Sequence, residues 1–271
     1  MRSEPPARVG IYRRVVGASL ERVWENVLDW EHLPWLHHSS FRAIERVDSG
    51  AWGWRARVGL HPAEAQREIL LELIIDRAKG EYTARTLEGV GAGSEIRTRL
   101  EPRQPQATAI EVEFRVPGVE PAAADAAGAA YIALYTRLWD EDESMMRRRE
   151  AALSRSRSGS GVGLEAVEVG SLEELRARAP IVVEASGRSY RIVELDDHFV
   201  VHATDCPHML GPLAEAAVED GCVRCPWHGY RFDLRTGLSA DGRGLRLAPA
   251  PELRVDPGTG TVRLCWNASG S

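Results

Sequence analysis

The sequence predicts an α+β protein, in which a domain of strands closed by a long helix is followed by a small all-β domain. Residues 8–116 hold one early helical pattern among many strand-like runs, which Gly- or Pro-containing turns separate. A long Ala-rich helix follows at roughly 121–153. Beyond residue 163 the chain consists mainly of short strand-like runs and turns, which favour an all-β domain.

The boundary between the two domains is predicted at residues 154–163, with the sequence SRSRSGSGVG. This segment is short, polar and rich in Gly and Ser, as flexible linkers are. It leaves domains at residues 1–153 and 164–271, and both have an ordinary domain size.

The first domain is predicted to begin with a strand at 8–16, followed by a helix that Ser19 caps. That helix carries an apolar stripe of Leu20, Val23, Trp24, Val27 and Leu28. The runs FRAIERV and WGWRARVGL flank the turn-like sequence DSG, which indicates a hairpin. Further strands are predicted at REILLELIIDRA, EYTARTL, SEIRTRL and AIEVEFRV.

The second domain is predicted to contain one short helix, at 171–179, among several strands. The strand-like runs are PIVVEA, RSYRIVEL, HFVVHA, CVRC, YRFDL and TVRLCW. The four cysteines all lie in the last quarter of the chain, at Cys206, Cys222, Cys225 and Cys265.

Composition excludes several classes of function. The formal net charge of −6 does not favour nucleic-acid binding. No apolar run is long enough for a membrane span, and the N-terminal residues lack the apolar core of a signal peptide. We therefore expect a cytoplasmic protein without a membrane partner, in which clustered cysteines indicate a metal site more than disulfides.

Two short motifs in the second domain carry the strongest indication of chemistry. Cys206 and His208 form C-x-H, Cys225 and His228 form C-x-x-H, and 16 residues separate the two motifs. Two thiolates and two imidazoles could hold a single zinc ion. They could also hold a [2Fe–2S] cluster, with the cysteines on one iron and the histidines on the other.

The segments CPHMLGPL and CPWHGYRFDLRTG resemble the two cluster-binding loops of Rieske proteins, over about residues 164–267. The resemblance implies a [2Fe–2S] cluster on Cys206, His208, Cys225 and His228, and it leaves Cys222 and Cys265 as inert strand residues. Gly211 and Gly229 would let the backbone approach the cluster sulfides.

The loops resemble those of ferredoxins and oxygenases more than those of respiratory Rieske proteins. Where the respiratory proteins carry a disulfide pair of cysteines and a serine, this chain has Gly211, Trp227 and Tyr230. Fewer hydrogen bonds to the cluster sulfurs imply a reduction potential at the low end of the Rieske range.

The element order of residues 8–153 resembles the helix-grip superfamily, which includes START-type lipid-binding proteins and polyketide cyclases. The segment VVGASLERVWENVLDWEHLPWL is similar to the first strand and helix of that superfamily. The resemblance implies an apolar cavity between the sheet and the long helix. Trp30, Trp35, Trp52 and Trp54 could line such a cavity, but core packing is the expected role of each.

A Rieske domain joined to a helix-grip domain resembles the Rieske non-haem iron oxygenases, although those proteins place the cluster domain first. Asp29, His32 and His37 match the oxygenase pattern of an acid, two residues, a histidine, four residues and a histidine. The resemblance implies that both histidines bind a mononuclear iron, and that Asp29 bridges one of them to a cluster histidine of a neighbouring subunit. Taken alone, these two histidines and His38 would be ordinary polar residues at a helix end.

Helix geometry adds two expectations about this iron site. Residues five apart on one helix point about 140° apart, so we expect Pro34 to break the helix at Leu33 and let the two histidines converge. The oxygenase resemblance implies a carboxylate as the third ligand, and the segment WDEDESMM of the closing helix resembles the acidic segment that supplies it. Within that segment Asp142 falls on the inward stripe, with Glu141 as the second candidate. Asp140 and Glu143 should point away. The inward stripe consists of Tyr131, Leu134, Tyr135, Leu138 and Met145.

The sequence therefore predicts an oxygenase component that carries a [2Fe–2S] cluster and a mononuclear Fe(II). The expected partners are a ferredoxin reductase or another electron donor, dioxygen and a small apolar substrate. The resemblance implies a homo-oligomeric ring, and the alternative is that the reversed domain order and the flexible linker let the two centres meet within one chain. Hydroxylation or oxidative demethylation is the expected reaction. The alternative is a ferredoxin-like electron-transfer domain fused to a ligand-binding domain without mononuclear iron.

Overall fold

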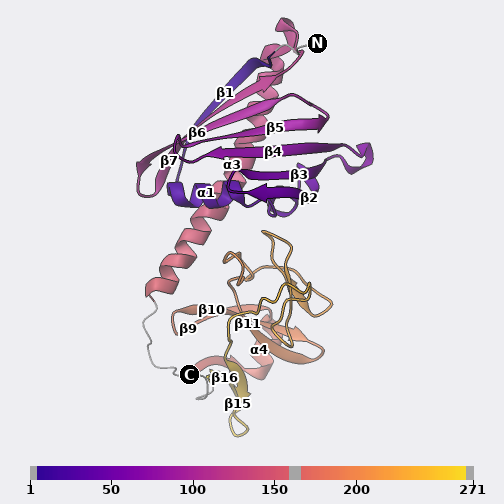
Figure 1. Cartoon of the computed structure of the whole chain (residues 1–271). Helices are drawn as coiled ribbons and strands as arrows, with labels where there is room; N and C mark the ends of the chain where they lie inside the picture. Colours follow the sequence, from indigo (N-terminus) through magenta and orange to yellow (C-terminus); the bar gives the residue numbers. More distant parts are fainter. Residues whose placement is uncertain (1–4, 159–165, 267–271) are drawn as a thin grey trace. The chain divides into compact units, whose positions relative to one another are not determined.

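The computed structural model describes residues 5–158 and 166–266, which divide into the units Met1–Arg147 and Arg148–Ser271 (Figure 1). The first unit is an antiparallel sheet with a long helix, and the second is a small unit dominated by short strands. This architecture confirms the predicted α+β fold class and the order of its two parts.

The first unit is built on a single antiparallel sheet of seven strands, in the order β1-β7-β6-β5-β4-β3-β2. From β2 to β7 the chain runs as a meander, and β1 closes the order by pairing with β7. The strands are β1 (Ala7–Val16), β2 (Phe41–Gly50), β3 (Gly53–Leu60), β4 (Glu68–Asp76), β5 (Glu81–Gly89), β6 (Glu95–Gln104) and β7 (Ala107–Val116).

Two short helices, α1 (Leu20–Leu28) and α2 (Leu33–Leu36), lie between β1 and β2, and the 3₁₀ turn η1 (Ala63–Ala65) follows β3. The Ser19 side chain accepts a hydrogen bond from the backbone N–H of Arg22, as the predicted cap requires. The buried apolar side chains of α1, which include Val23 and Trp24, pack into the core of this unit.

The long helix α3 (Pro121–Ser158) lies across the sheet (Figure 1). Gly128 allows a close approach to β1, because a Cβ atom there would lie 2.1 Å from the Val9 carbonyl oxygen. Further along the helix, the Tyr131 ring stacks on Phe114 of β7, and Tyr135 meets the same ring edge-on. These contacts fix which face of α3 points toward the sheet.

The helix α3 is longer than predicted, which changes one boundary. Residues 154–158, expected to be the start of the linker, are the last residues of α3. The remainder of the predicted linker, 159–163, lies outside the described residues. The domain limits at 153 and 164 stay a prediction.

The second unit contains three small antiparallel sheets, with the orders β11-β10-β9, β12-β13-β14 and β15-β16-β8. The predicted short helix is present as α4 (Leu172–Arg178), whereas β8, β12 and β15 were not predicted. Among the described residues of the chain, no helix is long and apolar enough to cross a membrane. The strands are β8 (Val167–Ser171), β9 (Ile181–Ala185), β10 (Arg188–Leu195), β11 (His198–Ala203), β12 (Val218–Glu219), β13 (Cys222–Arg224), β14 (Arg231–Asp233), β15 (Glu252–Val255) and β16 (Thr261–Cys265).

Candidate metal centres

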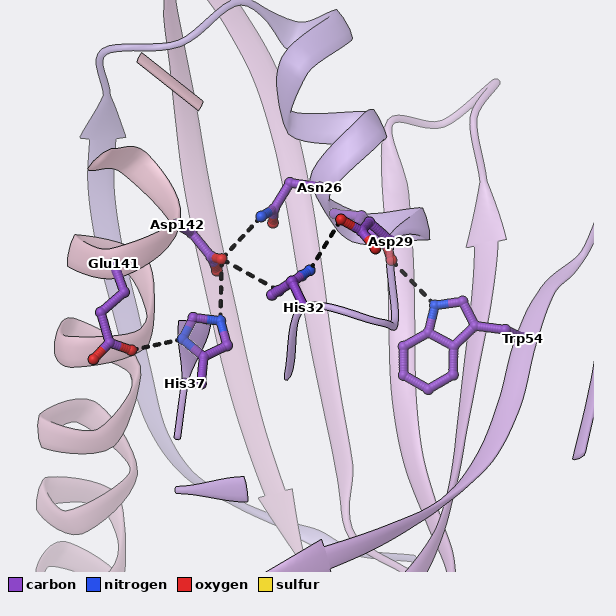
Figure 2. Close-up of polar contacts among 8 residues, drawn as sticks. Asn26, Asp29, His32, His37, Trp54, Glu141 and Asp142 are labelled. Carbon is purple, nitrogen blue, oxygen red and sulfur yellow. Dashed lines mark hydrogen bonds and ion pairs between the residues drawn. The ribbon is translucent and has the colours of Figure 1, made fainter. Parts of the chain in front are cut away.

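In the first unit, His32, His37 and Asp142 converge in the interior. One potential ligand atom from each lies within 4.8 Å of the other two, and all three residues are buried. Nε2 of His37 is 3.1 Å from Oδ1 of Asp142, and Nε2 of His32 is 3.5 Å from the same oxygen. Figure 2 shows both imidazole rings directed toward this carboxylate.

The two histidines converge because they bracket a single helical turn. His32 is the N-cap of α2 and His37 is its C-cap, and their ring centroids lie 5.1 Å apart. The prediction that Pro34 breaks a helix at Leu33 was wrong. The first helix ends earlier, at Leu28, and Pro34 lies in the first turn of α2, where its missing N–H is tolerated.

Each histidine has a carboxylate at its other ring nitrogen (Figure 2). Nδ1 of His37 lies 2.6 Å from Oε2 of Glu141, and Nδ1 of His32 lies 3.5 Å from Oδ2 of Asp29. A carboxylate at Nδ1 fixes the tautomer that leaves Nε2 available as a ligand. Glu141, the second candidate for the third ligand, thus faces the far side of His37 rather than the point where the three side chains meet.

Asp142 is held by a residue that the sequence reasoning did not select. The Asn26 amide of α1 donates a hydrogen bond of 2.9 Å to Oδ1 of Asp142. Asn26 is buried and directly precedes the apolar Val27, and no pattern in the sequence indicated that its amide would meet Asp142. Helix α1 therefore orients the carboxylate that α3 supplies.

Two acidic neighbours of Asp142 on α3 were predicted to point away from the cluster, and the prediction is right for one and wrong for the other. Asp140 points away and pairs with Arg14. Glu143, also expected to point away, is mostly buried instead. It pairs with Arg14 and accepts a hydrogen bond of 2.8 Å from the Gly17 backbone N–H, just beyond the end of β1. Glu143 thus ties α3 to the sheet and takes no part in the cluster around His37.

Burial and neighbouring charges have opposite effects on the pKa values of His37 and Asp142. Burial alone would lower the pKa of His37, but the carboxylates of Asp142 and Glu141 raise it above its usual value. Burial alone would raise the pKa of Asp142, but His37, His32 and Asn26 lower it. The negative charge of the cluster can thus be reduced in two ways, by protonation of His37 or by binding of a divalent cation. Two imidazoles and one carboxylate are the facial donor set of non-haem Fe(II).

A cavity of about 130 Å³ adjoins these three side chains. Trp54, which was one of four tryptophans considered for such a lining, contributes to its wall, as does Trp139. No lysine or arginine is among the described residues that line it. The apolar and aromatic part of the lining consists of Val27, Leu33, Phe41, Trp54, Leu71, Leu73, Tyr82, Ala84, Tyr135, Leu138 and Trp139.

In the second unit, two loops with matching backbone hydrogen bonds hold the four predicted cluster ligands. Cys206 N–H donates to Gly211 O over 2.8 Å, and Cys225 N–H donates to Tyr230 O over the same distance. The ring centroids of His208 and His228 are 4.5 Å apart. A hydrogen bond with Cys206 lowers the pKa of the Cys225 thiol. The loops therefore bring two sulfurs together and two imidazoles together.

The shape of this site fits a two-iron cluster better than one zinc ion. The ligand atoms of a tetrahedral zinc site would all lie close to one another. In the described part of the chain, only the His32, His37 and Asp142 group has ligand atoms that all lie within 4.8 Å of one another. A Cβ atom at Gly211 would lie 2.6 Å from Sγ of Cys225, so this glycine leaves space that any other residue would fill.

A sequence model of the family described as "Rieske [2Fe-2S] domain" matches residues 165–248. The C-terminal unit contains a Rieske domain. The matched segment includes both loops, and Rieske domains carry a [2Fe–2S] cluster. Cys222 lies on β13 and Cys265 on β16, and their expected place outside the ligand set stays a prediction.

Two curated relatives and one solved structure illustrate what the chain resembles. Over 69 residues it is 32% identical to the anthranilate 1,2-dioxygenase ferredoxin subunit of Burkholderia cepacia, a match that covers 26% of this chain and 64% of that protein. Over 75 residues it is 32% identical to apoptosis-inducing factor 3 of Mus musculus, covering 27% of this chain and 12% of that protein.

The solved structure is a START superfamily protein from Mycobacterium smegmatis, with 16% identity and a TM-score of 0.40, covering 51% of this chain and 95% of the other. The chain thus spans less than two thirds of the length of either curated relative. The family match lies wholly in the Rieske segment, so the metal chemistry of the first unit has to be judged from its own residues.

Proposed function

We propose that this chain is a Rieske-type non-haem iron oxygenase component that hydroxylates or demethylates a small apolar molecule. Cys206, His208, Cys225 and His228 would hold the [2Fe–2S] cluster. A mononuclear Fe(II) would be held by His32, His37 and Asp142. The observation that carries the proposal is the meeting of these last three side chains, buried and within 4.8 Å, beside an apolar cavity.

When bound, the cluster supplies single electrons and the ferrous ion activates dioxygen. The chain's own residues prepare the site for this chemistry. Glu141, beside Nδ1 of His37, and Asp29, near Nδ1 of His32, would favour the orientation in which Nε2 of each histidine faces inward, and Asn26 holds one oxygen of Asp142. We propose further that Asp29 relays electrons toward His32, as its position beside Nδ1 permits, and that a separate reductase is the electron donor.

The cavity constrains the substrate by size and by charge. An apolar cavity of about 150 Å³ is known to accommodate benzene, so a cavity of about 130 Å³ suits a molecule of about one ring without large substituents. The described residues that line the cavity include two carboxylates, Asp29 and Asp142, and no lysine or arginine. Because an unpaired buried charge is costly, a carboxylate-bearing substrate should be disfavoured.

A second candidate function rests on the match to a ferredoxin subunit. In that case the Rieske domain transfers electrons to another protein, and the first unit binds an apolar ligand. His37, protonated between Asp142 and Glu141, would then complete a metal-free ion-pair cluster.

The iron content of the full chain separates the two candidates. After anaerobic reconstitution with iron and sulfide, the oxygenase should hold about three irons per chain, and the ferredoxin-like protein about two. Changing both His32 and His37 to Ala should remove one iron and leave the visible spectrum of the cluster unchanged. A reconstituted wild-type protein that holds only cluster iron would rule out the oxygenase.

His38 provides the matched control, because it lies next to His37 but is exposed, and its Nδ1 contacts the Trp35 carbonyl. The His38→Ala variant should retain the third iron. Loss of that iron in His38→Ala as well would mean that the substitutions disrupt the local fold rather than a specific site.

A further inference from the structure

We propose that Arg243 is a positioning residue that raises the reduction potential of the Rieske cluster, acting through Tyr230. The inference rests on the proposed cluster ligands, but it is independent of the mononuclear iron. It follows from a stack of three side chains, His208, Tyr230 and Arg243, that begins at a cluster ligand and ends at the protein surface.

The stack is close at both of its contacts. The Tyr230 ring lies nearly parallel to the His208 ring, with centroids 4.4 Å apart and planes inclined by 21°. On the Tyr230 ring, the guanidinium carbon of Arg243 lies 3.9 Å from the centroid, and Nη1 donates a hydrogen bond of 2.7 Å to the tyrosine hydroxyl. Two contacts of different kinds therefore hold the guanidinium over the ring.

Tyr230 is placed to transmit the effect of this charge. It is buried, directly follows the His228-Gly229 pair, and meets the His228 ring edge-on as well as stacking on His208. A positive charge held over this ring thus lies one side chain away from both histidines.

Reduction adds one negative charge to the cluster, and a nearby cation stabilises that charge. The side chain of Arg243 also pairs with Asp241, whose Oδ2 lies 3.1 Å from Nε. Both side chains are partly exposed, so solvent weakens the effect of each. Removal of Arg243 would leave the Asp241 carboxylate uncompensated, and both changes should lower the potential.

The opposite signs of these two charges provide the test, which is the midpoint potential of the reconstituted full chain at fixed pH and ionic strength. For Arg243→Gln we expect a roughly threefold lower ratio of reduced to oxidised cluster at a fixed applied potential, which corresponds to about 30 mV for one electron. For Asp241→Asn we expect a shift in the opposite direction. Arg243→Lys, which keeps the charge, should restore most of the wild-type potential.

The matched controls are Arg254→Gln and Glu252→Gln, because these two residues form an exposed ion pair on β15 of the same unit. The proposal is overturned if the Arg243 and Asp241 variants shift the potential in the same direction, or by no more than the control pair. If the Arg243→Gln variant does not hold a cluster, the midpoint potentials of Asp241→Asn and Arg243→Lys test the proposal instead. A wild-type protein without a Rieske spectrum would instead refute the cluster ligands themselves.

Discussion

The two candidate centres are assembled in different ways. In the Rieske domain, two loops that share one backbone hydrogen-bonding pattern supply every predicted ligand, and all four lie between Cys206 and His228. In the first unit, the proposed ligands come from both ends of the one-turn helix α2 and from the middle of α3, more than a hundred residues later. The first kind of site depends on loop conformation, and the second on packing of a whole domain.

This difference predicts that each centre can be removed without affecting the other, and the largest effect is expected at Asp142. Asp142→Asn keeps the shape but loses the charge that faces both histidines. Losing a ligand should cost more than the roughly 10–100-fold in metal affinity that loss of a supporting residue costs, so the third iron should be absent from the isolated protein. Metal analysis and the cluster spectrum, measured on the same sample, check the result.

Asp140→Asn is the control for this substitution, since Asp140 is exposed on the same helix and pairs with Arg14. It should retain the third iron. If Asp142→Asn also removed the cluster iron, the two centres would depend on each other, contrary to the way in which their ligands are assembled.

Gly211→Ala should remove the cluster of the second unit and leave the iron site of the first unit intact. The added Cβ atom would lie 2.6 Å from Sγ of Cys225 and 3.1 Å from the buried Trp227 ring, and neither can move away without disturbing the loops. Overpacking of this kind costs about 1–3 kcal/mol. We expect a large loss of the cluster absorbance, with iron binding at His32, His37 and Asp142 retained.

A glycine elsewhere in the second unit tests whether that loss is specific. Gly258 has an ordinary backbone conformation, and a Cβ there would make only a normal contact of 3.4 Å with Asp256. Gly258→Ala should keep its cluster. Full cluster content in Gly211→Ala would show that the close approach of this glycine to Cys225 is not required.

The same difference explains what could be predicted from the sequence. The loops of the Rieske domain could be identified from a local motif, because their geometry is encoded in consecutive residues. Asp142 could be placed inward from helical periodicity alone. Its support by Asn26 could not, since that contact depends on how α1 meets α3, and neither segment encodes the other.

The errors in prediction have two causes, a local rule applied to the wrong helix and tertiary contacts that the sequence does not show. Pro34 was expected to end a helix, but a short chain segment starting a new helix tolerates proline in its first turn. Glu143 was expected to face solvent, yet it is drawn to the Gly17 N–H and to Arg14. The C-terminal end of α3 and the short strands β8, β12 and β15 carry too few apolar residues for a pattern to define them.

A smaller effect on iron binding is expected when a carboxylate that supports one of the histidines is replaced. Glu141→Gln keeps a side chain of the same length beside His37, but the neutral amide accepts a weaker hydrogen bond at Nδ1. We expect ferrous ion to bind about 10–100-fold more weakly, with no change in the cluster spectrum. Titration of the cluster-loaded protein with Fe(II) measures this affinity.

The control for Glu141→Gln is Asp125→Asn, which also replaces a carboxylate by an amide on α3. Asp125 is exposed and lies four turns before Glu141, away from both histidines. Asp125→Asn should bind Fe(II) as the wild-type protein does. Equal weakening in both variants would mean that the loss of negative charge on α3, rather than the contact with Nδ1 of His37, sets the affinity.

The smallest predicted effect concerns stability of the second unit alone. The Ser171 side chain accepts a hydrogen bond from the Glu174 N–H, and Glu174 accepts one from the Ser171 N–H, which forms a capping box at the start of α4. Ser171→Ala should destabilise this unit by about 1 kcal/mol, whereas Ser171→Thr retains the hydroxyl and most of the stability. Because α4 contributes no ligand to either centre, both variants should keep all their iron, and the effect should appear only in the unfolding transition monitored by the cluster absorbance. Equal destabilisation by Ala and Thr would show that the hydroxyl is not what stabilises the helix.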